Sequence, residues 1–482
     1  MLDLRPVGYV LGLLTIVMGL TMLFPMALDI ADGNANWQAF AVSGAVAVAL
    51  GGSVSLASAN FDLKQMSVRE AFLLTTATWS VLPLVGAIPF VLGAPDVSLT
   101  DAYFEAVSGM TTTGATVFPG LDDLPRGVNL WRGILQWLGG LGIVIVALIF
   151  LPVMRVGGMQ FFRSEGFDTL GKVLPRTIDI SRGLFTAYVV LTVACAITYG
   201  ALGMNWYEAT VHALTTLSTG GFSTTDRSFA AFSGPAEYAA VLFMILASVP
   251  FVRFIQIANG DRFALLRDVQ VQAYLRWIAY ACGAVIVWRV IVLGHDLEPA
   301  LRESTFNVVT LFTGTGYGSA DVTSWGSFPF AVVFIVGLIG GCTASTGCSV
   351  KVFRYLVLKE ALINQLRLLV SPRTVTVPRL DGRAIHQDVI DSVITFTVLF
   401  FLTLAVTAVA LSLTGLAPQT AITAAWTSVA NIGPAFGPEV GPSGSMEDFP
   451  VTAKWIMIFA MLIGRLELLA VFVLFTAAFW RG

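Results

Sequence analysis

The sequence predicts an all-α polytopic membrane protein with four parallel helix–pore-loop–helix repeats around a central pore, preceded by two further transmembrane helices. Three observations predict it: the apolar composition, the uneven distribution of basic residues and four similar Gly/Thr-rich loops. Of the 482 residues, 56% are hydrophobic and 12% are charged, whereas soluble proteins are about one quarter charged. Too few charges remain to cover soluble domains, and a net charge of −3 gives no basic field for nucleic acid.

Apolar segments long enough to cross a bilayer, which takes about 20 residues, occur along the whole chain. They lie near residues 8–30, 37–60, 71–95, 131–152, 183–204, 238–259, 274–294, 328–358, 390–416 and 451–480. The first segment is interpreted as a span and not as a signal peptide, because its apolar run is too long and a second apolar run follows directly.

Basic residues favour one side of this topology. With the N-terminus in the cytoplasm, 20 of the 27 Lys and Arg residues lie in cytoplasmic segments and five lie outside. Cytoplasmic loops carry such an excess, so both termini are expected in the cytoplasm. Arg289 and Arg465 remain within spans. Arg289 lies near the outer end of its span and is expected to extend its charge to the interface.

A fourfold repeat follows the first two spans. Its Gly/Thr-rich loops cover residues 111–118, 217–224, 312–319 and 430–437, and aligning them places Gly114, Gly220, Gly316 and Gly433 in register. Each repeat has two full spans, so all four loops are expected on the outer side, around one axis. The predicted units are the N-terminal pair 1–66 and the pore repeats 67–160, 161–265, 266–375 and 376–482, the third with a broken second helix.

The segments before the loops are too short to span the bilayer. They cover residues 98–112, 205–217, 299–312 and 418–430, and acidic residues or Pro stand near their starts, as at a helix N-terminus. We therefore expect re-entrant half-helices whose partially negative ends favour a cation. Glycine allows the backbone to turn carbonyl oxygens toward the axis, where they replace the hydration shell of a monovalent cation. The candidate ligands are the carbonyls of Thr112, Thr113, Gly114, Ser218, Thr219, Gly220, Gly314, Thr315, Gly316, Asn431, Ile432 and Gly433.

Any one of these loops could be an ordinary turn between helices. Four in register, each after a half-helix, favour a shared filter. The third loop, Thr313-Gly-Thr-Gly-Tyr-Gly318, is closest to the Thr-Val-Gly-Tyr-Gly loop of potassium channels.

A family resemblance is carried by the four loops, by Gly340–Gly347 with Lys351, and by Gly464–Glu467. Nearly the whole chain resembles the membrane subunit of the Trk/Ktr/HKT superfamily of potassium transporters, in its bacterial TrkH type. The resemblance implies a potassium-translocating pore in the bacterial inner membrane, with K+ as transported ion and no cofactor. It also implies a homodimer with one pore per protomer, and a cytosolic, nucleotide-binding regulatory ring of the TrkA type.

Residues 328–358 are too long for an untilted span, about 46 Å as a helix, and small polar residues interrupt them. The resemblance implies an intramembrane gate there, whereas close helix packing is the structural alternative. The candidate gate residues are Gly340, Gly341, Cys342, Thr343, Ala344, Ser345, Thr346, Gly347, Cys348, Lys351 and Arg465. Cys348-Ser349-Val350 stands where the family usually has Gly-Gly-Ile.

Arg465 lies halfway along the last span, where a charge is costly and faces a cavity or a partner. Glu467 is two residues away on another face of the helix, so we expect Arg465 to face the pore. A buried ion pair with another helix is the alternative.

Two other functions compete with the potassium pore. A Na+-permeable pore, or a symporter that couples K+ to Na+ or H+, would use the same fold; Gly114, where plant relatives with Na+ preference have Ser, favours K+. A membrane enzyme would need catalytic residues gathered at one depth, and His212, His295 and His386 are scattered. The four cysteines are expected to be small buried side chains. The polar segments 155–182, 260–276 and 359–389 are either basic cytoplasmic loops alone or docking surfaces for a cytosolic partner.

Overall fold

The computed structural model describes residues 3–60, 67–149, 177–374 and 376–481. These residues form helices joined by loops, with one short hairpin in which Arg379 pairs with Ala384. The α-helices are α1 (Arg5–Thr21), α2 (Leu23–Ala31), α3 (Trp37–Ala57), α4 (Val68–Leu92), α5 (Leu99–Met110), α6 (Arg126–Ile149), α9 (Thr177–Ala201), α10 (Trp206–Leu217), α11 (Pro235–Ala247), α12 (Phe251–Ala258), α13 (Ala264–Arg267), α14 (Val269–Ile291), α15 (Leu297–Thr313), α16 (Ser327–Ile339), α17 (Val352–Val370), α18 (Gln387–Ser412), α19 (Pro418–Ala430), α20 (Val451–Arg465), α21 (Leu469–Phe472) and α22 (Ala477–Arg481). The hairpin strands are β1 (Arg379–Leu380) and β2 (Arg383–Ala384).

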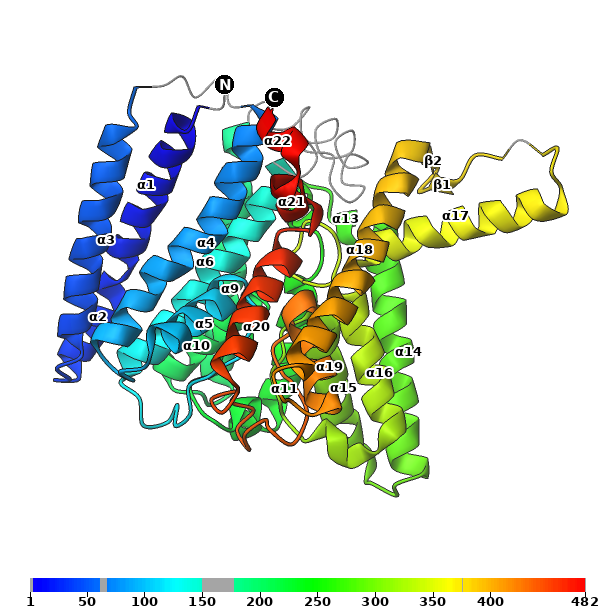
Figure 1. The fold of residues 1–482 in the computed structure, drawn as a ribbon. Helices are drawn as coiled ribbons and strands as arrows, with labels where there is room; N and C mark the ends of the chain where they lie inside the picture. The colour runs from blue at the N-terminus through cyan, green and yellow to red at the C-terminus, as the bar shows by residue number, and fades with distance from the viewer. Residues whose placement is uncertain (1–2, 61–66, 150–176, 375, 482) are drawn as a thin grey trace.

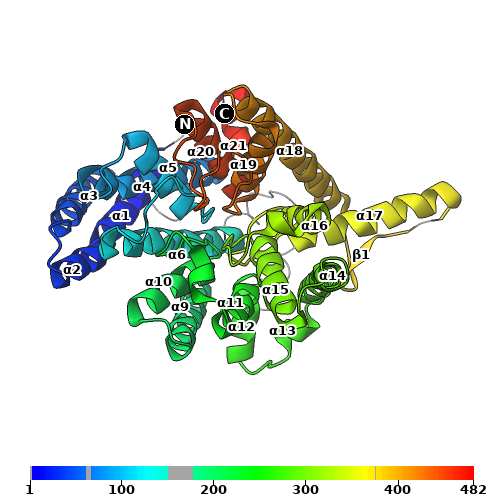
Figure 2. The ribbon, with the colours of Figure 1, turned by 90° about the horizontal axis from the view of Figure 1, so that it is seen from below.

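Four groups of helices surround the centre of the molecule in chain order, as the view along the bundle shows (Figure 2). Each group has a first helix, a helix that leads into one of the loops and a third helix after the loop: α4–α5–α6, α9–α10–α11, α14–α15–α16 and α18–α19–α20. Both chain ends lie at the same end of the bundle (Figure 1). The predicted all-α fold with four repeats around a centre is confirmed.

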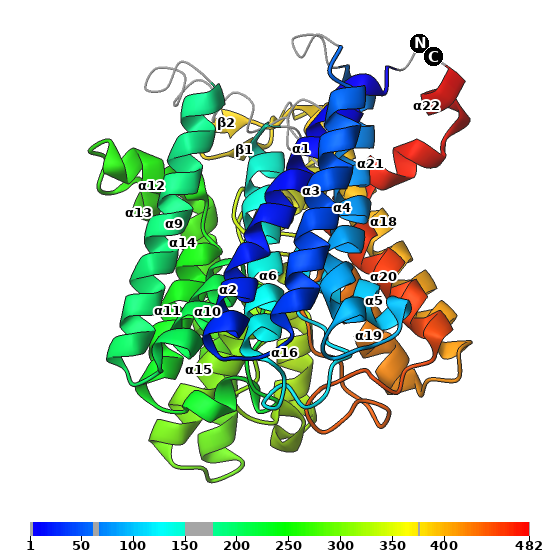
Figure 3. The same cartoon turned by 90° about the vertical axis from the view of Figure 1, so that its left-hand side faces the viewer.

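The N-terminal helices α1, α2 and α3 stand outside the first repeat (Figure 3). Glycines let their backbones approach closely. A Cβ atom on Gly12 would lie 2.7 Å from the carbonyl oxygen of Gly51, and one on Gly19 would lie 2.9 Å from that of Gly44. Small residues at such a crossing are typical of membrane helix pairs, where close van der Waals packing drives association.

Seven described helices are long and apolar enough to cross a membrane, and α11 with α12 makes an eighth if this bent pair is one span. Three of the predicted spans are broken, one of them as predicted. The 328–358 segment is divided, as predicted, into α16 and α17. The 451–480 segment is also divided, because α20 ends at Arg465 and Glu467 and Leu468 have positive φ angles of 60° and 47°.

The second helix of repeat 2 carries a break that the sequence analysis did not predict. Helices α11 and α12 meet at an angle of 90° across Ser248, Val249 and Pro250. Pro250 was the available signal, since proline ends or kinks a helix. In repeat 3, the helix α17 follows the break after α16 and projects sideways from the bundle in both views (Figures 1 and 2).

The prediction for Arg289 is wrong. Its side chain does not extend to the interface but is 3% exposed. Nη2 lies 2.6 Å from Oε2 of Glu303 on α15, and the guanidinium lies over the ring of Trp325 at 4.3 Å. Glu303 is brought to it by the tertiary packing of α14 on α15.

Candidate functional site

The four half-helices α5, α10, α15 and α19 begin with ordinary N-terminal signals. Ser98 caps α5 by accepting a hydrogen bond from the Asp101 N–H, and Asn205 forms a reciprocal capping box with Glu208 on α10. Pro418 occupies the first turn of α19, where its missing N–H costs nothing. The C-terminal ends of these helices therefore lead into the four loops.

The loops share one backbone pattern. A left-handed residue follows each half-helix, and a left-handed glycine stands two positions later. The first residues of these pairs are Thr112, Thr219, Gly314 and Asn431, and the glycines are Gly114, Gly221, Gly316 and Gly433. Between them, one N–H in each loop bonds to the carbonyl oxygen five residues earlier, at 2.8–3.0 Å; these donors are Thr113, Gly220, Thr315 and Ile432.

The expected register is therefore wrong by one residue in the second loop. Gly221, and not Gly220, corresponds to Gly114, Gly316 and Gly433. Loop 2 contains two adjacent glycines, and both satisfy a sequence alignment. Only the backbone angles separate them, because Gly221 has φ +77° and Gly220 has no positive φ.

The four loops close into a ring in the order 1-2-3-4. A Cβ atom built on each left-handed glycine would meet the carbonyl oxygen of the neighbouring loop: Gly114 against Gly220, Gly221 against Thr315, Gly316 against Ile432 and Gly433 against Thr113. The same contact thus recurs four times, and the last loop returns to the first. At these positions only glycine fits without a backbone shift.

One cavity of about 190 Å³ is lined by all four of these glycines. Its wall also includes Arg132 and, in the loops beyond the ring, Asp226 and Asp321. The ring therefore faces a common space. Asn431 joins the ends of the ring, because its Nδ2 donates to Thr113 Oγ1 at 2.9 Å and to the Met461 carbonyl at 3.0 Å.

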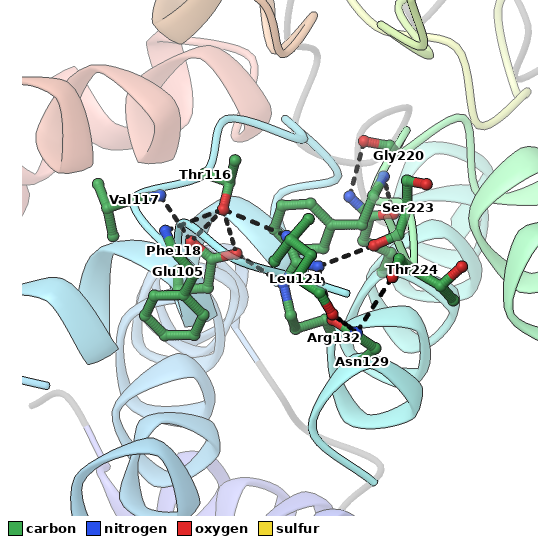
Figure 4. A network of polar contacts seen from close by, with 12 residues as sticks. Glu105, Thr116, Val117, Phe118, Leu121, Asn129, Arg132, Gly220, Ser223 and Thr224 are labelled. Carbon is green, nitrogen blue, oxygen red and sulfur yellow. Dashed lines mark hydrogen bonds and ion pairs between the residues drawn. The ribbon is translucent and has the colours of Figure 1, made fainter. Parts of the chain in front are cut away.

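A row of polar residues on α6 supports loops 1 and 2 from behind (Figure 4). Arg132 is 1% exposed, pairs with Glu105 of α5 at 2.7 Å and donates to the Ser223 carbonyl at 3.0 Å. Asn129 donates to the Leu121 carbonyl at 2.8 Å. Sequence reasoning missed this role. The signal was polar residues three and seven positions after Asn129, at Arg132 and Gln136, on one face of an apolar span.

The candidate gate loop lies directly next to the ring. Cys348 Sγ is 3.7 Å from Thr112 Oγ1 of loop 1, and a Cβ atom on Gly314 of loop 3 would lie 3.1 Å from the Cys348 Cβ. The helix break in repeat 2 holds this loop, since Cys342 N donates to the Ser248 carbonyl at 2.8 Å and Phe251 N donates to the Ala344 carbonyl at 3.0 Å.

Other predicted gate residues brace the loop itself. Gly340 ends α16 with φ +81°, and Gly341 approaches Gly347 closely. Thr343 N donates to Gln270 Oε1 at 3.1 Å, and Ser345 Oγ donates to the Cys342 carbonyl at 2.7 Å. Thr346 Oγ1 donates to the Ala247 carbonyl at 2.9 Å. Cys342 and Cys348 are free and buried, as are Cys195 and Cys282.

The buried charges near the gate are unequally paired. Glu467 accepts from Lys351 at 3.3 Å and also pairs with Arg354. Arg465 is 4% exposed and pairs with no carboxylate in the described residues; its Nη1 donates to Cys348 Sγ at 2.7 Å, while Nε and Nη2 have no partner there. The described residues thus give Arg465 no buried ion pair, and its guanidinium meets the gate loop.

The described residues contain no group of three or more His, Cys, Asp or Glu side chains that could hold a metal ion. The arrangement offers backbone carbonyls, hydroxyls and fixed charges.

Comparison with known proteins agrees with this architecture. Residues 36–481 match the family model described as "TrkH: Cation transport protein". The chain is 39% identical over 478 residues to the Trk system potassium uptake protein TrkI of Halomonas elongata, covering 99% of this chain and 97% of that protein. It is 33% identical to the Trk system potassium uptake protein TrkH of Escherichia coli, covering 99% of both.

A solved structure is similar over the full length. The crystal structure of the potassium transporter TrkH from Vibrio parahaemolyticus superposes with a TM-score of 0.91 at 30% sequence identity, and the match covers 100% of both chains. The family is one of membrane transporters and not of enzymes. By its sequence and by its fold, this chain belongs to the TrkH family of cation transport proteins.

Proposed function

We propose that this chain is the potassium-translocating pore subunit of a bacterial Trk-type uptake system. The observation that carries the proposal is the closed ring of four left-handed glycines, each against the carbonyl of the next loop. The relatives' names, which refer to potassium uptake, support K+ as the ion.

The selectivity filter is formed by the backbone of the four loops. The partially negative ends of four half-helices lead into them and favour a cation. Carbonyl oxygens held by the alternating left-handed residues replace water around a dehydrated ion. The residues involved are those named from the sequence, with Gly221 added at the position of the other three glycines.

The gate is the loop from Gly340 to Cys348 together with Lys351 and Arg465. The loop touches loops 1 and 3 of the ring through Cys348, so it lies across the path of an ion that leaves the filter. The Arg465 guanidinium adds a fixed positive charge there, which opposes cation occupancy. Movement of the loop from the helix break of repeat 2 opens the path.

The assembly is a homodimer in the bacterial inner membrane with both termini in the cytoplasm, and a cytosolic, nucleotide-binding ring of the TrkA type controls it. The basic-residue asymmetry supports the orientation. Of the segments expected to dock this ring, 260–276 and most of 359–389 lie in the described part, whereas 155–176 lie outside it. A Na+-permeable or ion-coupled transporter of the same fold is the competing function.

Growth of a potassium-uptake-deficient bacterium at low external K+, with and without the cytosolic ring protein, tests the function. Rescue by the wild-type chain is expected. Gly221→Ser and Gly316→Ser should abolish it at normal protein levels, because a side chain there meets a neighbouring carbonyl. Gly220→Ser should be milder, since the atoms nearest to its Cβ belong to the side chain of Gln136 and not to a neighbouring backbone. A loss of growth with Gly220→Ser that equals or exceeds the loss with Gly221→Ser would contradict the register. Wild-type rescue that occurs only when Na+ is added to the medium would favour the competing function.

Arg465→Ala tests the gate. Removal of the positive charge should raise Rb+ uptake several-fold in reconstituted vesicles, with unchanged thermal stability. The control is Lys454→Ala on the same helix, which is not expected to raise uptake. Lys454 lies away from the gate, and its Nζ is 2.6 Å from Oδ1 of Asp101. Loss of the protein without a gain in flux would show that Arg465 has only a structural role.

A further inference from the structure

The side chain of Gln136 on α6 is fully buried, and both ends of its carboxamide bond to loop 2. Nε2 donates to the carbonyl oxygen of Gly220 at 2.6 Å, and Oε1 accepts from the N–H of Phe222 at 3.1 Å. The two hydrogen bonds bracket Gly221, the left-handed glycine of this loop. One side chain of repeat 1 therefore fixes the peptides on both sides of the ring position of repeat 2.

The other three loops lack this clamp. The carbonyls at the position of Gly220 are those of Thr113, Thr315 and Ile432, and none of them accepts a hydrogen bond within the described residues. In loop 3, the N–H at the position of Phe222 is that of Tyr317, and it bonds within its own repeat, to Thr310 Oγ1 at 2.8 Å. In loop 4, Pro434 has no N–H. The ring is thus fourfold in backbone shape but not in the bonding of its carbonyls.

We propose that Gln136 is a specificity-determining positioning residue of the filter. It holds the Gly220 carbonyl against Gly114 of the neighbouring loop and prevents the two flanking peptides of Gly221 from rotating. A carbonyl fixed in this way cannot move inward to follow a smaller cation. The donor also draws electron density from that oxygen, which weakens the field that would favour a smaller ion with higher charge density. Both effects favour K+ over Na+, and the inference rests on the proposed function.

Removing the Gln136 carboxamide costs free energy, because it leaves two buried backbone groups without a hydrogen-bond partner. Without Gln136, the Phe222 N–H and the Gly220 carbonyl would each need another partner in a water-poor region. Rotation of either peptide would supply one, at the expense of the left-handed conformation of Gly221. A change at Gly220 should act in the same way, because a Cβ atom there would displace the carboxamide of Gln136.

Three variants separate hydrogen bonding from shape. Gln136→Met keeps the length and removes both bonds, Gln136→Leu removes both bonds with a shorter apolar side chain, and Gly220→Ala displaces the carboxamide. Gln272→Met, at an exposed glutamine of α14, is the matched control. Rb+ and Na+ uptake are measured in vesicles reconstituted with equal amounts of each protein. We expect the Rb+ to Na+ ratio to fall roughly tenfold in all three variants and to stay unchanged in the control.

The ratio distinguishes this role from a purely structural one. Equal loss of Rb+ and Na+ uptake, with the ratio retained, would overturn the proposal. So would a wild-type ratio in Gln136→Met, or, should that variant not accumulate, in Gln136→Leu or Gly220→Ala. Failure of the proposed function has a different signature, because the wild-type chain itself would then show no preference for Rb+ over Na+.

Discussion

Loops 1 and 2 of the ring are held by hydrogen bonds and charge, whereas loop 4 is packed by aromatic rings. Behind loops 1 and 2, Glu105 and Arg132 form an ion pair at 2.7 Å, and both side chains are at most 1% exposed. Before loop 4, Trp426 of α19 stacks on Phe334 of α16 with ring centroids 5.1 Å apart. Loops 1 and 2 on one side and loop 4 on the other thus have the same backbone geometry but different supporting interactions.

The same fold therefore places all of these loops, whereas different side-chain interactions hold each of them in place. Directional bonds set the orientation of individual peptides, as Arg132 does for the Ser223 carbonyl. Aromatic packing sets the distance between helices and leaves the peptides to the loop itself. Loop 4 accordingly depends on its own side chains, such as Thr427, whose hydroxyl accepts from the Gly433 N–H at 2.7 Å.

The largest effect is expected from Arg132→Met. It leaves the Glu105 carboxylate buried without its partner, which costs about 3–5 kcal/mol, and thermal unfolding in detergent measures the loss. The double variant Glu105→Gln/Arg132→Met should regain a large part of it, because no uncompensated charge then remains. A single variant as stable as the wild type would show that the pair does not support the loops.

A smaller effect is expected from Phe334→Leu. The substitution keeps an apolar side chain on α16 and removes the stacking on Trp426, which is worth about 1 kcal/mol. Because no polar group is stranded, the variant should accumulate normally and keep its Rb+ to Na+ ratio. A loss of stability as large as that of Arg132→Met would contradict the proposed difference between the support of loops 1 and 2 and that of loop 4.

The smallest effect is expected from Asp32→Asn. Asp32 pairs with Arg126 at the start of α6, but the two side chains are 23% and 43% exposed, so solvent screens the pair to below about 1 kcal/mol. The hydrogen bond from Arg126 lowers the pKa of Asp32. The stabilisation is therefore present at neutral pH and is lost as the pH falls through that lowered pKa.

Thermal unfolding of the wild type and Asp32→Asn at pH 7 and at strongly acidic pH checks this sign. The small difference between the two proteins should vanish in acid. A difference that grows in acid would contradict the assignment. A much smaller loss here than in Arg132→Met would show that burial, and not charge alone, makes the support of loops 1 and 2 strong.

The chain's membrane character, its repeats, the half-helices and the break after Gly340 were predictable from the sequence. Each of these depends on a local pattern: a run of apolar residues, a cap before a short segment, or small polar residues within a span. The choice between Gly220 and Gly221 was not predictable, because adjacent glycines differ only in backbone angles that the neighbouring loop imposes. The buried partner of Arg289 was equally hidden, since Glu303 lies on the next helix.

That four similar loops follow four half-helices could be read from the chain, because hydropathy and capping depend on a few neighbouring residues. Which side chains hold those loops depends on how the repeats pack together. Gln136 is 84 residues from the Gly220 carbonyl that it binds, and Arg465 is 117 residues from Cys348. Contacts at such separations arise only when the repeats close around one axis, and it is this closure that sets one glycine of each loop against the carbonyl of the next.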